Sequence, residues 1–92
     1  MDKDRGEMEK EKVGKAVEDF GGLIREYRLA NHLSLQDMAE IVGYSASYIW
    51  RIEKYRRYPE MDTKLKMLLA MWSIEDVHMY LAEIVAREKN EN

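Results

Sequence analysis

The stretch HLSLQDMAEIVGYS, residues 32–45, constrains the fold of this chain more than any other feature. Ser34 followed by Asp37 is a helix N-cap signature, because each side chain can satisfy a free amide at the start of a helix. The apolar residues that follow recur at helical spacing and are Leu35, Met38, Ala39 and Val42. Gly43 supplies the positive φ that ends this helix, and Ser45 can cap the next one. The stretch therefore predicts two short helices joined by a tight turn.

Helical spacing also dominates the rest of the chain, where no alternation typical of a strand is found. Two glycines inside one helix would cost roughly 2 kcal/mol, so Gly21-Gly22 separates a short leading helix or turn from the first core helix. The five core helices are expected at about 21–31, 35–42, 45–54, 61–72 and 73–89. Residues 1–12 are predicted to be a disordered charged arm, residues 13–89 a single domain with a long last helix, and residues 90–92 a loose tail.

Composition excludes several classes of protein. The 92 residues suffice for one small core, and the absence of Cys removes disulfides and zinc–thiolate sites. His32 and His78 have no second ligand at metal-binding spacing, so we expect no metal and no cofactor. The chain shows no phosphate loop and no supported catalytic set, so we do not expect an enzyme. No apolar run approaches the ~20 residues of a membrane span, which predicts a cytoplasmic protein without a membrane partner.

Charge is unevenly distributed along the chain. The net charge is −3, yet Arg51, Lys54, Arg56 and Arg57 stand against the single acid Glu53 between residues 51 and 57. Binding to nucleic acid depends on the local potential rather than on the average charge. This basic cluster therefore predicts contact with a polyanion near the end of the third expected helix.

From Phe20 to about residue 82, the chain resembles the Cro/CI-type, or XRE-type, helix-turn-helix regulators. The resemblance rests on FG before IREYR, LS before MAEIVGYS, then SYIWRIE and R.P…TKL. It implies an all-α, five-helix bundle with a lambda-repressor-like DNA-binding domain. It also implies a homodimer that binds double-stranded DNA, acts as a repressor and inserts its third helix, about 45–54, into the major groove.

The resemblance also assigns roles to individual residues. Arg28 and Glu53 match a structural ion pair beneath the third helix. The DNA-binding positions that it implies are Ser45, Ala46, Ser47, Trp50, Arg51, Lys54, Arg56 and Arg57. Among these, Arg51 fits the guanine edge, because its planar fork can bond O6 and N7 together. Lys54, Arg56 and Arg57 suit phosphates, which position a protein without specifying sequence.

Two departures from the family pattern favour an alternative function. Leu35 stands where many members have a Gln that contacts phosphate, and Trp50 is unusual on a surface that faces the groove. The alternative is a helix-turn-helix fold reused as a protein-interaction module, with little DNA affinity. Its partner would bind through Trp50 and the neighbouring tyrosines.

Overall fold

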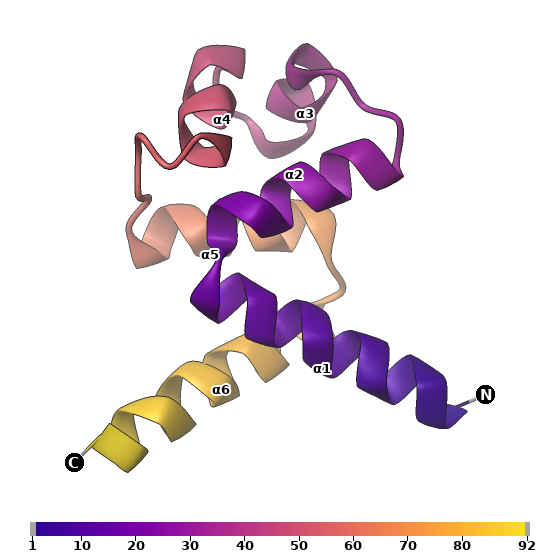
Figure 1. The fold of residues 1–92 in the computed structure, drawn as a ribbon, viewed down its shortest axis with the longest axis vertical. Coiled ribbons are helices and arrows are strands. Elements are labelled where there is room, and N and C mark those ends of the chain that lie inside the picture. Colours follow the sequence, from indigo (N-terminus) through magenta and orange to yellow (C-terminus); the bar gives the residue numbers. More distant parts are fainter. Residues whose placement is uncertain (1, 92) are drawn as a thin grey trace.

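The computed structural model describes the backbone of residues 2–91 and the side chains of residues 9–90. Over the described backbone it contains six α-helices and no strand (Figure 1). The helices are α1 (Asp2–Glu18), α2 (Phe20–Ala30), α3 (Leu35–Val42), α4 (Ala46–Glu53), α5 (Met61–Met71) and α6 (Ile74–Glu91). The all-α class is therefore confirmed, with six helices in place of the five expected.

The additional helix is α1, which begins at Asp2 and so includes most of the segment, residues 1–12, that the sequence predicts to be a disordered charged arm; Met1 lies outside the described residues. Lys12, a charged residue of α1 whose side chain is described, makes two contacts that hold this part of the helix against the rest of the fold. The Lys12 Nζ lies 2.6 Å from Asp76 Oδ2 and 5.1 Å from the centroid of the Trp72 ring. At the other terminus, α6 continues to Glu91, whereas residues 90–92 were expected to form a loose tail, of which Asn92 lies outside the described residues.

The Gly21-Gly22 pair lies in the first turn of α2, which begins at Phe20, one residue before the start that the sequence predicts. Asp19 caps this helix, and its Oδ1 accepts a hydrogen bond from the Gly22 amide at 2.9 Å. A Cβ at Gly21 would collide with the carbonyl oxygen of Ile52. Glycine is therefore needed at position 21 because the first turn of α2 packs against the end of α4.

The helix-turn-helix geometry follows the local caps that the sequence predicts. The Ser34 amide donates to Asp37 Oδ2 and the Asp37 amide donates to Ser34 Oγ, each at 2.9 Å, which forms a reciprocal capping box. Gly43 ends α3 with φ of 80°, and its amide donates to the Ala39 carbonyl at 2.9 Å. Ser45 then caps α4. The turn between α3 and α4 is thus fixed by hydrogen bonds within a few residues.

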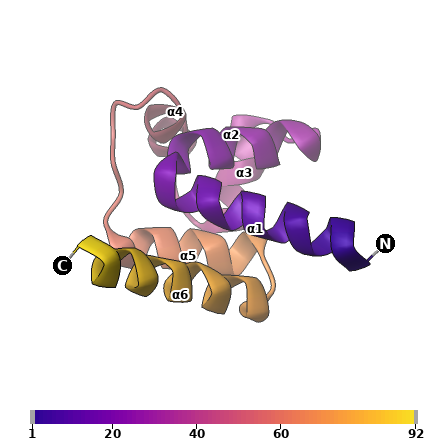
Figure 2. The same ribbon diagram turned by 60° about the horizontal axis from the view of Figure 1, so that its bottom comes forward.

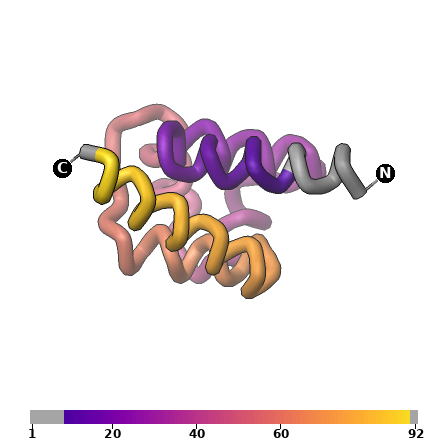
Figure 3. Tube along the Cα trace, turned by 90° about the horizontal axis from the view of Figure 1, so that it is seen from below, coloured from indigo at the N-terminus to yellow at the C-terminus, as the bar shows by residue number. Residues whose placement is uncertain are grey.

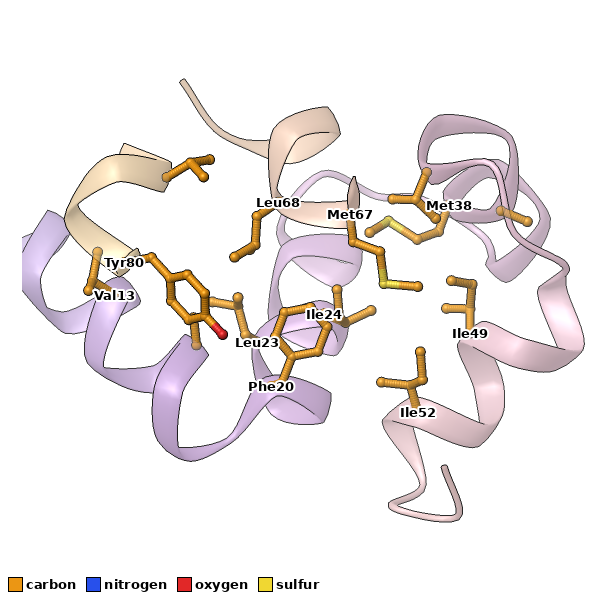
Figure 4. Close-up of a cluster of buried hydrophobic side chains, with 14 residues drawn as sticks. Val13, Phe20, Leu23, Ile24, Met38, Ile49, Ile52, Met67, Leu68 and Tyr80 are labelled. Atoms are coloured by element: carbon orange, nitrogen blue, oxygen red, sulfur yellow. The ribbon is translucent and has the colours of Figure 1, made fainter. Parts of the chain in front are cut away.

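All six helices contribute to one buried core (Figure 4). Its fully buried large side chains are Ile24, Met38, Ile49, Ile52, Met67, Leu68 and Tyr80. On α5, Met67 and Leu68 are fully buried, whereas the side chain of Leu69 is 52% exposed. Helix α5 packs against both α3 and α6.

The helices divide the molecule into two ends. Figure 1 places α3 and α4 at one end and α1 and α6 at the other, with α2 and α5 between them. The views in Figures 2 and 3 show α5 beside α6, in agreement with the contacts between these helices. Because α3 and α4 lie at the opposite end from α1 and α6, the helix-turn-helix pair is free to present its outer surface away from those two helices. Among the described residues, no helix is both long and apolar enough to span a bilayer.

Candidate nucleic-acid interface

The third helix of the predicted bundle is α4, and its two sides differ sharply. Ile49 and Ile52 are buried on the inward side. Ser47, Arg51 and Lys54 are exposed, and their spacing of three to four residues places them together on the outward side. The structure thus brings these three predicted site residues onto one surface.

Arg28 and Glu53 hold the base of α4 against α2. Arg28 Nε donates to Glu53 Oε2 at 2.7 Å, and Nη2 donates to Oε1 at 2.9 Å. A third bond runs from Arg28 Nη1 to the Leu33 carbonyl at 3.0 Å, so the guanidinium also ties down the connection to α3. The hydrogen bonds to Glu53 raise the pKa of Arg28 above its ordinary value. The two parallel bonds make a bidentate ion pair at the positions where the resemblance implies a structural ion pair.

The same pair changes the surface charge around α4. The Glu53 side chain is only 3% exposed, and its charge is neutralised by Arg28. The four cationic side chains near it, Arg51, Lys54, Arg56 and Arg57, are all exposed. The one acid that the sequence counts against this cluster is therefore absent from its surface.

Ser45 and Ala46, at the start of α4, have structural contacts. Ser45 Oγ accepts a hydrogen bond from the Tyr48 amide at 3.1 Å, which leaves the hydroxyl hydrogen available to another acceptor. Ala46 is partly buried and packs against the core. Of these two predicted DNA contacts, Ser45 retains a donor that faces solvent, whereas Ala46 has only part of its surface exposed.

Arg56 and Arg57 stack on aromatic rings of α4. The Arg56 guanidinium lies 5.4 Å from the Trp50 ring centroid, and the Arg57 guanidinium lies 5.9 Å from that of Tyr48. Because positions 48 and 50 point about 200° apart on a helix, these pairs flank opposite sides of α4. The 39% exposed Trp50 is therefore not part of one aromatic platform with Tyr48.

Tyr55 is a positioning residue that the sequence interpretation missed. Its φ of 59° reverses the chain directly after α4, and its hydroxyl donates to Asp19 Oδ1 at 2.9 Å. The Gly22 amide, and then the Tyr55 hydroxyl, lower the pKa of the Asp19 carboxyl. Asp19 before Phe20 carried a cap signal in the sequence, but nothing there indicated the left-handed turn at Tyr55.

A hollow opens between the end of α4 and the start of α5. It is lined by Tyr48, Arg56, Arg57, Tyr58, Pro59, Glu60, Asp62 and Thr63. The carboxylates Glu60 and Asp62 share this lining with Arg56 and Arg57, so they offset part of the positive charge of the two arginines on that side. Arg51 and Lys54 do not line the hollow and are exposed on the outward side of α4.

Leu35, the departure from the family pattern, lies at the start of α3 and packs against the core. An apolar side chain here contributes to burial and cannot donate a hydrogen bond to phosphate. We therefore do not include position 35 in the interface. At the start of α3, the exposed polar groups therefore belong to the residues next to Leu35 and not to Leu35 itself.

The fold and the exposed basic surface define a helix-turn-helix protein. A family model described as a helix-turn-helix domain matches residues 19–68, more than half of the chain. The chain therefore belongs to the helix-turn-helix domain family, which confirms the resemblance. The family indicates, at a general level, a DNA-binding regulator. Searches of curated proteins and of solved structures return no match.

Proposed function

We propose that the protein is a sequence-specific DNA-binding transcriptional regulator that inserts α4 into the major groove. In this proposal the fold is lambda-repressor-like, and the protein is a repressor that acts as a homodimer in the cytoplasm. It has no enzymatic activity of its own. The observation that carries the proposal is the exposed cluster of Arg51, Lys54, Arg56 and Arg57, from which the nearby acid Glu53 is withdrawn by Arg28.

The outward side of α4 supports distinct roles for these residues. Arg51 lies in the last turn of α4, where an extended guanidinium can form two hydrogen bonds with guanine. Lys54, Arg56 and Arg57 follow it at the end of the helix and are suited to phosphates on either side of the groove. Ser45 and Ser47 at the leading end supply hydroxyl donors.

Salt dependence of binding tests the phosphate contacts. With Lys54, Arg56 and Arg57 on phosphates, the logarithm of the affinity should fall with log salt with a slope of about −3 per copy. Lys54→Ala should reduce the magnitude of that slope by about one and weaken all duplexes alike. Lys66→Ala, an exposed lysine of α5, is the matched control. Undetectable duplex binding at ~50 mM salt would refute the proposal.

Base recognition is tested by Arg51→Ala on a duplex selected from a random pool. The substitution should cost about 1–3 kcal/mol and relax the preference at one base pair. A reporter gene placed behind the selected duplex then tests repression. Activation of the reporter would contradict the repressor role and leave DNA binding intact.

The alternative, a protein-interaction module, is supported by the exposed Trp50. Trp50→Ala and Arg51→Ala separate the two functions. Under the DNA proposal, Arg51→Ala removes the base preference. Under the alternative, Trp50→Ala abolishes capture of a protein partner while Arg51→Ala leaves that capture unchanged.

A further inference from the structure

A second cleft lies where the junction of α1 and α2 meets the end of α4 and the segment that leads to α5. Its volume is about 230 Å³. Its apolar walls are formed by Val17, Phe20, Ile52, Tyr55, Tyr58 and Pro59. For comparison, an apolar cavity of about 150 Å³ accepts one benzene ring. The cleft is therefore large enough for a single aromatic ring that carries one small substituent.

The walls of this cleft differ in their exposure to solvent. Phe20, Ile52 and Pro59 are buried, whereas Tyr55 is 51% and Tyr58 is 76% exposed. A Cβ at Gly21 would press on the Tyr55 ring, so the missing side chain lets that ring lie against α2. A planar ligand in the cleft would thus contact buried apolar groups at its floor and tyrosine rings at its rim.

The two carboxylates in the lining, Glu18 and Asp19, already have partners. Arg87 Nη1 donates to Glu18 Oε1 at 3.0 Å. Asp19 Oδ1 accepts hydrogen bonds from the Gly22 amide and from the Tyr55 hydroxyl, each at 2.9 Å. These bonds reduce the negative charge that would otherwise repel an anion from the cleft.

The lysine in the lining has no carboxylate partner. Lys64 forms no ion pair with any residue whose side chain is described, and its Nζ lies 5.6 Å from the centroid of the Phe20 ring. This contact holds the ammonium over the ring without neutralising its charge. Arg57 also lines the cleft, but its guanidinium lies 5.9 Å from the ring centroid of Tyr48, which is outside the lining. The positive charge available to a ligand in the cleft is therefore that of Lys64.

We propose that this cleft binds a small aromatic carboxylate, whose ring contacts Phe20 and Tyr58 and whose carboxylate accepts hydrogen bonds from Lys64 Nζ. A hydrogen bond between an ammonium and a carboxylate is among the stronger ones in proteins. An aliphatic acid would lack the contacts between rings, and an aromatic amine would place a second positive charge beside Lys64. The walls and the charge of the cleft together select the class of ligand.

The site goes beyond the proposed function and does not depend on it. Arg51 and Lys54, on the outward side of α4, do not line the cleft. A bound aromatic carboxylate would therefore leave these two side chains accessible to a duplex. Binding of the ligand and binding of DNA can be measured separately.

Titration of the 92-residue chain with sodium benzoate at constant ionic strength tests the site, followed by NMR of the backbone amides. The dissociation constant should lie below about 5 mM, since ligands of about nine non-hydrogen atoms reach the millimolar range. The amide signals that should shift together are those of Phe20, Tyr55, Tyr58 and Lys64. Absence of these shifts at about 50 mM benzoate would overturn the proposal.

Two further ligands separate the contributions of ring and charge. Benzamide has nearly the shape of benzoate without its charge and should bind at least about fivefold more weakly. Acetate has the carboxylate without the ring and should not shift the same signals at the same concentration. A benzamide affinity equal to that of benzoate, or equal shifts with acetate, would overturn the assigned class of ligand.

Substitution of Lys64 tests the contact with the carboxylate. Lys64→Met keeps the apolar stem and should weaken benzoate binding at least about fivefold. Lys66→Met is the matched control, because Lys66 is exposed on the same helix and lies outside the lining. Equal benzoate affinity of the native chain and Lys64→Met would refute the role of Lys64.

Substitution of Tyr58 tests the contact with the ring. Because this side chain is 76% exposed, Tyr58→Ala should remain folded, which far-UV circular dichroism verifies. It should weaken benzoate binding at least about threefold, whereas Tyr58→Phe should bind as the native chain does. Native affinity in Tyr58→Ala would overturn the binding mode. None of these measurements involves a duplex, so the cleft can fail while DNA binding is confirmed, and the reverse.

Discussion

Replacing Arg28 with Met provides the most direct test of how α4 is held in place. The substitution keeps an apolar stem of similar length and removes the guanidinium. Glu53 would lose both of its hydrogen bonds while its side chain remains 3% exposed. The Leu33 carbonyl would lose its donor as well.

The expected cost of Arg28→Met is large for a domain of this size. Leaving one member of a buried ion pair without its partner costs about 3–5 kcal/mol. A 92-residue domain has a free energy of unfolding of roughly 5–14 kcal/mol, at about 0.05–0.15 kcal/mol per residue. The substitution should therefore remove at least about a fifth of the free energy of unfolding and, at the upper limit, all of it.

Urea denaturation followed by circular dichroism measures this loss. The matched control is Arg25→Met, because Arg25 is exposed on the same helix and forms no ion pair within the described chain. Its free energy of unfolding should change by less than about 0.5 kcal/mol. The double variant Arg28→Met/Glu53→Met should recover most of the loss, since an apolar pair leaves no buried charge.

Two results would refute the reasoning. A loss below about 1 kcal/mol for Arg28→Met would mean that Glu53 finds water or another donor when its partner is removed. A double variant no more stable than the single one would mean that packing of the arginine stem, rather than charge compensation, accounts for the loss.

Three further predictions concern the caps and glycines. Ser34→Ala should lower the free energy of unfolding by about 1 kcal/mol in urea denaturation, because it removes one half of the capping box. Gly21→Ala should lower the free energy of unfolding by about 1–3 kcal/mol, whereas Gly14→Ala, with open space around its Cβ, should raise it by about 0.5–1 kcal/mol. A Gly21→Ala variant more stable than Gly14→Ala would contradict the close packing of α2 on the end of α4. The pKa of Asp19 is lower in the folded protein than in the unfolded chain. Its carboxylate therefore stabilises the fold above the unfolded-state pKa, and this stabilisation is lost as the pH falls through the folded-state pKa. The melting temperature of Asp19→Asn should accordingly depend less on pH below about 4 than that of the native protein.

The helix-turn-helix pair could be predicted because its determinants are local. Ser34 and Asp37 bond each other's amides three residues apart, and Gly43 ends α3 with its own φ. Such signals are contained within one turn of helix, so the sequence alone reveals them. The outward position of Arg51 follows from the same periodicity.

Helix α1 could not be predicted because its support comes from distant residues. Lys12 bonds a residue 64 positions away, and Glu18 pairs with Arg87, which lies 69 positions away. Read locally, the first 12 residues offer alternating charges and almost no apolar side chain. Tertiary contacts with α6 therefore stabilise a helix whose first turns offer almost no apolar side chain to the core.

The basic cluster shows a similar division between local and long-range determinants. Its composition is evident from the sequence, but the stacking of Arg56 on Trp50 and of Arg57 on Tyr48 is not. Both arginines follow the left-handed Tyr55, whose direction depends on the bond to Asp19, 36 residues away. Spacing along a helix cannot locate side chains that lie beyond the end of that helix.

The segment that matches the family does not close its own core. Val13 and Ala16 precede residue 19, and Val77 and Tyr80 follow residue 68, yet all four are buried. Without them, the side of α2 that carries Leu23 would face water. Helices α1 and α6 are therefore required to stabilise α2, against which α4 packs through the Arg28 guanidinium. It follows that substitutions at the α1–α6 contact should weaken the proposed DNA binding by unfolding α2 and α4, with no change in any base preference among the molecules that remain folded.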